Sequence, residues 1–348
     1  MKFEALTIKD IAKALDLSIS TVSKALRGSH EISEETKQAV LRYARENNYK
    51  PNPIAQSLKR GQSRSIGVIV CNIDNNFFSQ VINGIESIAQ NRGYNVIITQ
   101  SQESYEKEVS NSDHLSSRSV DGLIISLSAE TQQVDHLVKL HEKGLPIVFF
   151  DRITDEIRTH RIVANNYKGA YEATQHLLQQ GCRRIAHVTS SGSLSITRER
   201  LEGYKQALKD AGVGPDDRLI KFCPHAGMIR AEAQQALTEL LQLPERPDAI
   251  FTASDRLSTT TLSLLQAMRI PIPCEIALVG YTNSISAEIF NPSLTSVVQP
   301  ALEMGKLATE MLLSLIESRR PVTHFEKRIL DTELQIRESS LKSKCKSL

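Results

Sequence analysis

Residues 7–27 read TIKDIAKALDLSISTVSKALR and predict two short helices joined by a tight turn. In the first half, apolar residues recur at helical spacing. Thr7 with Asp10 has the pattern of a capping box, in which a hydroxyl accepts a hydrogen bond from an N–H group at the helix start. Ser18 is a good N-cap for the second helix. The segment is typical of a DNA-binding helix pair, although a two-helix corner of an ordinary domain would show the same bare pattern.

The outer side of the second predicted helix carries small hydroxyls and a cation. Val22, Ala25 and Leu26 are expected to face the first helix. The residues left on the outside are Ser20, Thr21, Ser23 and Lys24. Small hydroxyls let a helix approach base edges closely, and hydroxyl and ammonium groups can bind bases and phosphates. The pattern therefore predicts a helix that enters the major groove of DNA.

Two further helical segments follow this pair. Ser33 is expected to begin a third helix with acidic residues in its first turn, so that three helices bury one small core. Pro51 then breaks the chain, Asn52 can cap, and Pro53 sits at the first position of a short helix of about two turns. A helix this short is marginal alone in water, and Leu58, which is followed by Lys59 and Arg60, has no core of its own to enter.

Charge is distributed unevenly along the 348 residues. Residues 1–60 hold 11 Lys and Arg against 7 Asp and Glu, a net charge of +4, whereas the rest of the chain holds 31 against 33, a net charge of −2. The overall +2 therefore conceals a basic N-terminal segment, as expected for one that binds nucleic acid.

No apolar run approaches the roughly 20 residues that span a membrane, and the N-terminus has no hydrophobic signal core. We therefore expect a cytoplasmic protein.

The cysteines are odd in number, widely spaced and without a Cys-x-x-Cys pair. They are Cys71, Cys182, Cys223, Cys274 and Cys345. This spacing predicts buried, reduced thiols in preference to disulfides or a zinc site. The nine histidines form no metal-ligand motif either, so we expect no metal and no cofactor.

From Ser65 onward, short apolar strands alternate with amphipathic helices. One set of expected strands covers residues 66–70, 96–99, 122–126 and 147–150, and a second set covers 162–164, 185–188, 219–222, 249–252 and 277–280. The clearest expected helices are 77–92, 167–180 and 198–211. Such alternation is typical of a parallel, doubly wound sheet with helices on both faces. Because the pattern begins twice, we predict two similar α/β lobes.

The order of motifs in this chain resembles that of the LacI/GalR family of bacterial transcription regulators. The matching motifs are TIKDIA, STVSKAL, NPIAQSL, SIGVIV, Asp121-Gly-Leu-Ile124, Arg200-Leu-Glu-Gly-Tyr204 and Ile336-Arg-Glu-Ser-Ser340. One such motif would be weak, whereas seven in this order are specific and span the chain from Thr7 to Ser340.

The resemblance implies a three-helix helix-turn-helix head at 1–50, a hinge helix and linker at 51–64, and a two-lobed effector-binding and dimerisation core at 65–348. Such a core resembles periplasmic binding proteins. We place lobe 1 at about 65–164 and 295–325, and lobe 2 at about 165–294 and 326–340.

The same resemblance implies which residues meet DNA. Ile19, Ser20 and Lys24 would face bases, and Leu58 would enter the minor groove between base steps, which kinks the duplex and couples hinge folding to DNA binding. The candidate DNA-binding residues are Thr7, Ser18, Ile19, Ser20, Thr21, Ser23, Lys24, Asn52, Ala55 and Leu58.

Residues that follow strand ends are the candidates for a small-molecule site, because parallel sheets bind ligands beyond the carboxyl ends of their strands. They are Asn75, Phe77, Phe78, Asp151, Arg152, Asn165, Arg200, Asp255, Thr282 and Gln299. Helix packing for Phe78 and a solvated loop for Asp151-Arg152 are the alternative interpretations. By resemblance, Arg200 corresponds to an arginine that grips the effector. The serine-rich loop at 189–193 before its helix could hold a phosphate.

One position departs from the family pattern. Where the family commonly carries an aspartate that accepts hydrogen bonds from the effector, this chain has Thr282, followed by Asn283. A neutral hydroxyl replaces a charged acceptor there. An anionic ligand, such as a sugar acid or a sugar phosphate, would tolerate this change better than a neutral sugar would.

We therefore expect a DNA-binding transcription regulator, a repressor, controlled by a sugar or sugar derivative between the lobes. Control by a partner protein docked on the lobes is the alternative. An enzyme is not expected, because no Gly-x-x-x-x-Gly-Lys loop and no recognisable Ser, His and Asp set is present, and no catalytic residue is assigned. A secreted binding protein would need a signal peptide and would leave the basic head unexplained.

The C-terminal segment bears on the expected assembly. Tetrameric members of the family add a leucine-repeat helix, whereas this chain ends eight residues after Ser340. We therefore expect a homodimer on a pseudo-palindromic operator, with each head on one half-site.

Overall fold

A computed structural model describes residues 6–50, 62–342 and 345 of the chain. It divides into two compact units, residues 1–63 and 64–348, which are described separately below. Three predicted DNA-binding residues, Asn52, Ala55 and Leu58, lie outside the described residues. Among the helices that the structure describes, none is long and apolar enough to cross a membrane.

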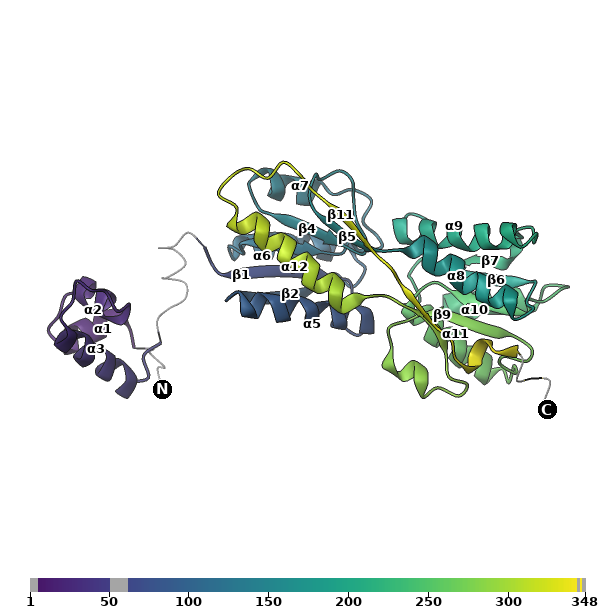
Figure 1. Cartoon of the computed structure of the whole chain (residues 1–348), viewed down its shortest axis with the longest axis horizontal. Helices are drawn as coiled ribbons and strands as arrows, with labels where there is room; N and C mark the ends of the chain where they lie inside the picture. The colour runs from purple at the N-terminus through teal and green to yellow at the C-terminus, as the bar shows by residue number, and fades with distance from the viewer. Residues whose placement is uncertain (1–5, 51–61, 343–344, 346–348) are drawn as a thin grey trace. The chain divides into compact units, whose positions relative to one another are not determined.

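In the described residues of the N-terminal unit there are three helices, α1 (Ile8–Ala14), α2 (Ile19–Leu26) and α3 (Glu34–Glu46) (Figure 1). Each begins at a hydroxyl cap, as predicted. The caps Thr7, Ser18 and Ser33 each accept a hydrogen bond from the backbone N–H three residues later, and Asp10 completes the capping box of α1. The core of the unit is small and consists of Ile11, Ala12, Val22, Ala25, Val40 and Ala44.

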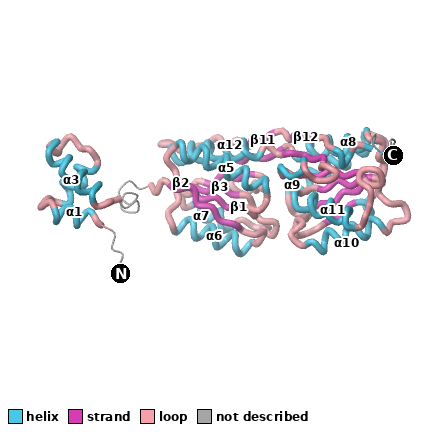
Figure 2. Tube along the Cα trace, turned by 90° about the horizontal axis from the view of Figure 1, so that it is seen from below, coloured by secondary structure: helices cyan, strands magenta, loops and turns pink. Residues whose placement is uncertain are grey.

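The C-terminal unit holds two lobes, each built on a six-stranded sheet with helices on both sides (Figure 2). The sheet of lobe 1 is parallel in the order β11-β5-β4-β3-β1-β2. Its strands are β1 (Ser65–Val70), β2 (Asn95–Gln100), β3 (Gly122–Ile125), β4 (Ile147–Phe150), β5 (Arg161–Ala164) and β11 (Lys327–Leu330).

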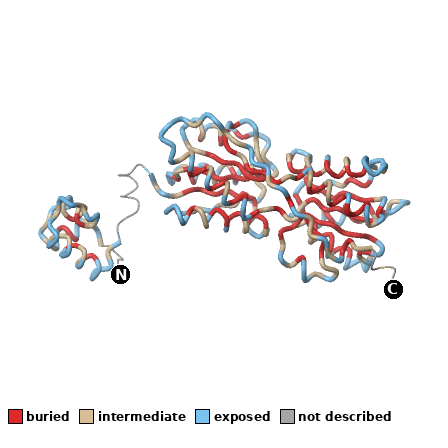
Figure 3. The backbone as a smooth tube through the Cα atoms, viewed as in Figure 1, coloured by how far each residue is buried: buried red, intermediate tan, exposed pale blue. Residues whose placement is uncertain are grey.

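The sheet of lobe 2 has the order β12-β10-β9-β8-β6-β7. Its strands are β6 (Ile185–Thr189), β7 (Ile220–Phe222), β8 (Ala249–Thr252), β9 (Ala277–Tyr281), β10 (Thr295–Val298) and β12 (Glu333–Gln335). They run parallel except for β12, which is antiparallel to β10. The central strands are buried on both faces (Figure 3), which explains why they read as continuous apolar runs.

The helices of the two lobes alternate with these strands. Lobe 1 carries α5 (Asn76–Asn91), α6 (Tyr105–Ser117), α7 (Asp135–Glu142) and α12 (Ala301–Glu317), and lobe 2 carries α8 (Asn166–Gln179), α9 (Ser195–Asp210), α10 (Arg230–Leu241) and α11 (Asp255–Ala267). Short 3-10 turns are η1 (Asp217–Leu219), η2 (Ile285–Glu288) and η3 (Glu338–Ser340). The strands and helices predicted after Ser65 are confirmed to within one residue at their ends, except that α9 begins three residues before the predicted start at 198.

The described chain crosses between the lobes after β5, after β10 and after β11 (Figure 1). Because β10 pairs with β9, the second crossing follows Val298 and lies later than the predicted boundary at 295. Because β11 pairs with β5, the third crossing follows Leu330, so the predicted return to lobe 2 at 326 was wrong. In both cases, a short strand stays hydrogen-bonded in its sheet before the chain leaves.

Glycines allow helices to approach closely in each lobe. A Cβ at Gly305 of α12 would lie 2.1 Å from the Val81 carbonyl oxygen of α5, and one at Gly203 of α9 would lie 2.2 Å from the Tyr167 carbonyl oxygen of α8. No side chain fits at such distances. A close approach of two helices at a glycine therefore recurs in both lobes, in agreement with the predicted internal similarity.

The closing motif of the chain is anchored in lobe 2. The Ser339 hydroxyl donates to the Leu278 carbonyl oxygen at 2.6 Å. The Ser340 hydroxyl lies 2.7 Å from both Nε2 of His176 and Oγ1 of Thr295. Both serines are fully buried, so this motif fastens the C-terminal segment to the second sheet.

The cysteines do not all match the prediction of reduced thiols. Cys71, Cys182 and Cys223 are free and buried, whereas Cys274 and Cys345 form a disulfide. The prediction was therefore wrong for this pair. The two residues are 71 positions apart in sequence, and only the fold brings their Cα atoms within 5.4 Å.

Candidate functional site

The outer face of α2 presents the predicted DNA-binding residues of the head. Ile19 is 47% exposed and Ser20 is exposed, while Val22 and Ala25 are buried toward the other helices. The remaining predicted residues on this helix, Thr21, Ser23 and Lys24, are partly exposed. An exposed apolar side chain beside hydroxyls and an ammonium suits the edges of base pairs, including the thymine methyl group.

Two of the predicted DNA-binding residues are the N-caps of helices. The Thr7 and Ser18 hydroxyls cap α1 and α2, and the Ser18 hydroxyl also lies 2.8 Å from that of Thr21. Both caps are exposed. They fix where the helices begin and so position the rest of the α2 face.

In the C-terminal unit, nine of the ten predicted effector residues line one cavity of about 50 Å³ between the lobes. They are Asn75, Phe77, Phe78, Asp151, Arg152, Arg200, Asp255, Thr282 and Gln299. They follow the strands β1, β4, β8, β9 and β10 or lie on α9, so the carboxyl ends of both sheets meet here as expected. The cavity is also lined by Ser190, which belongs to the serine-rich loop considered above, and by Ser254, which precedes Asp255. The other lining residues, which the sequence pattern did not select for the site, are Ile196, Thr197, Ala253, Tyr281 and Asn283.

Asn165 is the predicted residue that lies outside this wall. Its Oδ1 accepts a hydrogen bond from the Lys168 N–H at 3.2 Å and caps α8, and its Nδ2 donates to Asp331 at 3.0 Å. It therefore fastens a helix start to the segment that joins β11 to β12.

Arg200 supplies a buried cation to the cavity wall, since only 4% of the residue is exposed. Its Nε donates to Oδ1 of Asn166 at 2.9 Å and its Nη1 to the Ala253 carbonyl oxygen at 2.6 Å. The guanidinium lies 3.8 Å from the centre of the Tyr281 ring, a cation–π distance. None of the ion pairs within 4.0 Å among the described residues involves Arg200. The guanidinium is thus fixed in position without a carboxylate at ion-pair distance, although its charge acts on the buried Asp151 carboxylate of the same wall.

Two carboxylates lie in the same wall. Burial raises the pKa of Asp151 and of Asp255 above the usual value for aspartate. The Thr282 hydroxyl donates to Oδ1 of Asp255. This chain has Thr282 where the family commonly carries an aspartate. A carboxylate nevertheless lies next to that position, because Asp255 of α11 accepts the hydrogen bond from Thr282.

Arg152 is held differently from Arg200. Its guanidinium makes two hydrogen bonds to the Glu103 carboxylate, at 2.5 and 3.1 Å, and Nη1 lies 3.4 Å from the Cys71 sulfur. Arg152 is buried, so this ion pair neutralises a cation inside lobe 1. The solvated-loop interpretation of Asp151-Arg152 is wrong, since both residues are buried.

The aromatic residues of the wall also belong to the core. The Phe77 and Phe78 rings meet edge to face at 5.2 Å, and Phe78 meets Phe150 at 6.1 Å. Both phenylalanines pack in the lobe 1 core and line the cavity. The packing interpretation of Phe78 is therefore confirmed, and it is compatible with an apolar contact to a ligand.

The lobes touch each other beside the cavity. Gln80 of α5 donates to the Asn283 carbonyl oxygen at 3.1 Å, and Nδ2 of Asn283 donates to Oε1 of Gln80 at 2.9 Å. Asp74 and Arg256 form an ion pair at 3.6 Å. In the same wall, the side-chain amide of Gln299 is buried and interacts with the Asp151 carboxylate, on which it acts to lower the pKa.

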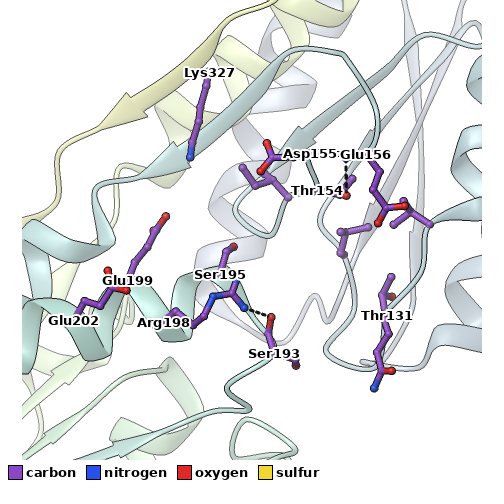
Figure 4. Close-up of a pocket in the computed structure, with 14 residues that line it drawn as sticks. Thr131, Thr154, Asp155, Glu156, Ser193, Ser195, Arg198, Glu199, Glu202 and Lys327 are labelled. Carbon is purple, nitrogen blue, oxygen red and sulfur yellow. Dashed lines mark hydrogen bonds between the residues drawn. The ribbon is translucent and has the colours of Figure 1, made fainter.

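A second, larger cavity of about 490 Å³ lies between the lobes and is lined by different residues (Figure 4). Ser193 and Arg198 belong to it, and Nη1 of Arg198 donates to the Ser193 carbonyl oxygen at 2.6 Å. The carboxylates Asp155, Glu156, Glu199 and Glu202 also line it, which disfavours the phosphate considered for the serine-rich loop. Within the described part of the chain, no group of three His, Cys, Asp or Glu residues could hold a metal ion.

Comparison with known families gives two matches along the chain. Residues 7–52 match the model of bacterial regulatory proteins of the lacI family, and residues 174–340 match that of periplasmic binding protein-like domains. The first match covers the three-helix head. The second begins within α8 of lobe 2 and runs to the closing motif, so it includes α12 and β11 of lobe 1.

Similar proteins cover nearly the whole chain. An HTH-type transcriptional repressor PurR of Vibrio atlanticus is 33% identical over 96% of this chain and 98% of its own length. A ribose operon repressor of Haemophilus influenzae is 32% identical with the same coverage. Among solved structures, a transcriptional regulator CelR in complex with cellobiose is 28% identical, with a TM-score of 0.69 over 96% of this chain and 99% of that one. The chain therefore belongs to the LacI family of bacterial regulatory proteins and is a DNA-binding transcription regulator with an effector-binding core.

Proposed function

We propose that this chain is a cytoplasmic repressor that binds a pseudo-palindromic operator as a homodimer, and that a small molecule between the lobes controls operator binding. The observation that carries the proposal is the cavity wall that gathers polar and aromatic side chains from the carboxyl ends of both sheets. The relatives support it, since one is named for the ribose operon and a similar structure contains cellobiose. Control by a partner protein has no support among these relatives.

The chemistry of the wall favours a carbohydrate derivative with an anionic group. Arg200 offers a fixed guanidinium without an ion pair, which suits a carboxylate or phosphate. Asp255 and the Gln299 amide can accept from and donate to hydroxyls. Phe77 supplies an apolar surface for the face of a ring.

The size of the cavity links ligand binding to movement of the lobes. At about 50 Å³, it is far smaller than the roughly 300–1,000 Å³ of ligand pockets. A sugar derivative therefore requires the lobes to separate or the wall to rearrange. Separation of the lobes would break the hydrogen bonds between Gln80 and Asn283, which gives the ligand a means of shifting the equilibrium between two lobe arrangements.

An exposed apolar segment of lobe 2 supports the homodimer. Ile285 and Ile289, at the start and just after the end of η2, are 80% and 82% exposed. Large apolar side chains this exposed are typical of an interaction surface. A two-fold dimer would bury both copies of the segment.

The test begins with enrichment of DNA duplexes from a random pool by the purified protein, followed by affinity measurements on the enriched and a scrambled duplex. We expect Lys24→Ala to weaken operator binding by roughly 1–3 kcal/mol if Lys24 reads a base, whereas a phosphate contact would weaken both duplexes equally. Failure to enrich any duplex over the scrambled one would contradict DNA recognition.

A thermal-shift screen then tests the ligand class. D-Ribose, cellobiose, sugar acids, sugar phosphates and nucleosides are compared, and we expect a sugar acid or sugar phosphate to raise the melting temperature and to change affinity for the enriched duplex. Stabilisation by neutral sugars alone would refute the anionic group and leave the rest of the proposal in place.

A further inference from the structure

An ion pair in the head engages the residue that the family resemblance assigns to base contact. Lys24 lies in the last turn of α2, and its ammonium donates to Oε2 of Glu31 in the loop before α3. That hydrogen bond lowers the pKa of the Glu31 carboxylate below its usual value. The side chains of Lys24 and Glu31 are 38% and 53% exposed, so water reaches both and the pair can open.

A carboxylate on this ammonium competes with DNA for it. The acceptors that DNA offers to a lysine are phosphate oxygens and the O6 and N7 atoms of guanine. Glu31 presents the same kind of acceptor within the protein. If Glu31 stayed on Lys24 in the complex, its charge would lie close to the phosphates and be repelled, so the pair has to open before Lys24 can contact DNA.

We propose that Glu31 is an intramolecular competitor that occupies Lys24 in the free head, so that every DNA complex that uses Lys24 must first break this ion pair. The inference rests on the proposed contact of Lys24 with DNA. It makes Glu31 a residue that lowers operator affinity without touching DNA, and it predicts that removal of its charge tightens binding.

The same head contains a matched control. Glu34, on the first turn of α3, is an exposed glutamate that forms an ion pair with Lys37 at 3.3 Å and a hydrogen bond with Gln38 at 3.0 Å. Replacing Glu34 by Gln removes one negative charge from the head, as the Glu31 substitution does, but it leaves Lys24 paired. A difference between the two variants therefore reports on Lys24 and not on net charge.

The experiment measures binding of the full-length protein to a duplex enriched by the wild type, by fluorescence anisotropy at fixed KCl concentration. We expect Glu31→Gln to tighten binding about 2- to 5-fold, the range that corresponds to an exposed ion pair. In a Lys24→Met background, Glu31→Gln should have no such effect. Glu34→Gln should give a smaller change that is the same in both backgrounds. Melting curves confirm that each variant is folded.

Several outcomes would overturn the inference. Weaker binding by Glu31→Gln would mean that the carboxylate orients Lys24 for its contact. Equal effects of Glu31→Gln and Glu34→Gln, or a Glu31 effect that persists with Met at position 24, would mean that only net charge matters. If Lys24→Met itself leaves binding to both the enriched and the scrambled duplex unchanged, the assigned contact of Lys24 fails, and the inference fails with it.

Discussion

Arg198 and Arg200 are two residues apart on α9, yet they line different cavities. Arg198 is exposed and bonded to the carbonyl oxygens of the loop before its own helix, whereas Arg200 is buried and bonded to Asn166 and Ala253. The pair therefore provides a test in which the same substitution is made on the same helix in two environments.

We predict that Arg200→Ala abolishes the response of operator binding to the ligand found in the screen, while Arg198→Ala preserves it. Both variants should bind the operator as the wild type does without ligand. Arg200→Ala should also lower the free energy of unfolding by about 1–3 kcal/mol, because Asn166 Oδ1 and the Ala253 carbonyl oxygen lose their donor. Loss of the ligand response in Arg198→Ala alone would place the effector in the larger cavity.

Single residues show how far sequence reasoning could reach in this chain. Residues that directly follow strands were correctly expected to meet between the lobes, because the carboxyl ends of parallel strands share one edge. The same rule cannot distinguish a side chain that turns toward the cavity from one that turns back to cap a helix, and Asn165 is of the second kind. Asn283 was noticed only as the neighbour of Thr282, although its contact with Gln80 joins the lobes.

Among the secondary-structure elements, the packing of α5 against α12 depends on a residue without a side chain. We predict that Gly305→Ala lowers the free energy of unfolding by about 1–3 kcal/mol. The new methyl group would meet the Val81 carbonyl oxygen and force the two helices apart. Gly214→Ala is the control, since no atom lies within 4 Å of the added methyl group, and it should stay within about 0.5 kcal/mol of the wild type. Urea unfolding of both variants gives the comparison, and equal stabilities would contradict the close approach.

Elements with strong periodicity were predictable, and short polar ones were not. The central strands read as apolar runs because both of their faces are covered. By contrast, β11 (Lys327–Leu330) has three exposed residues and β12 (Glu333–Gln335) has only three residues in all, so neither stands out in the sequence. Their hydrogen bonds to β5 and β10 define which lobe they join, and these long-range pairings determine where the chain crosses.

Across the whole molecule, the disulfide divides the cysteines into two classes. We predict that the protein with Cys274 and Cys345 paired reacts slowly with a thiol reagent. The reason is that Cys71, Cys182 and Cys223 are buried and burial raises the pKa of each thiol. Gentle reduction should expose two fast-reacting thiols, Cys274 and Cys345, which lie at the surface or partly exposed. Mass spectrometry of the labelled peptides identifies them. Rapid labelling of any of the three buried cysteines before reduction would contradict this arrangement.

The crossings between the lobes also affect how the protein is made. Strand β11 completes the first sheet next to β5, but the ribosome synthesises it only after every strand of lobe 2 except β12. At about 5–20 residues per second, roughly 10–30 seconds separate β5 from β11 during translation. Throughout that interval the growing chain carries an incomplete first sheet whose β5 edge is open to pairing with other chains. The nascent protein, more than the finished one, is therefore the form in which this fold is exposed to aggregation.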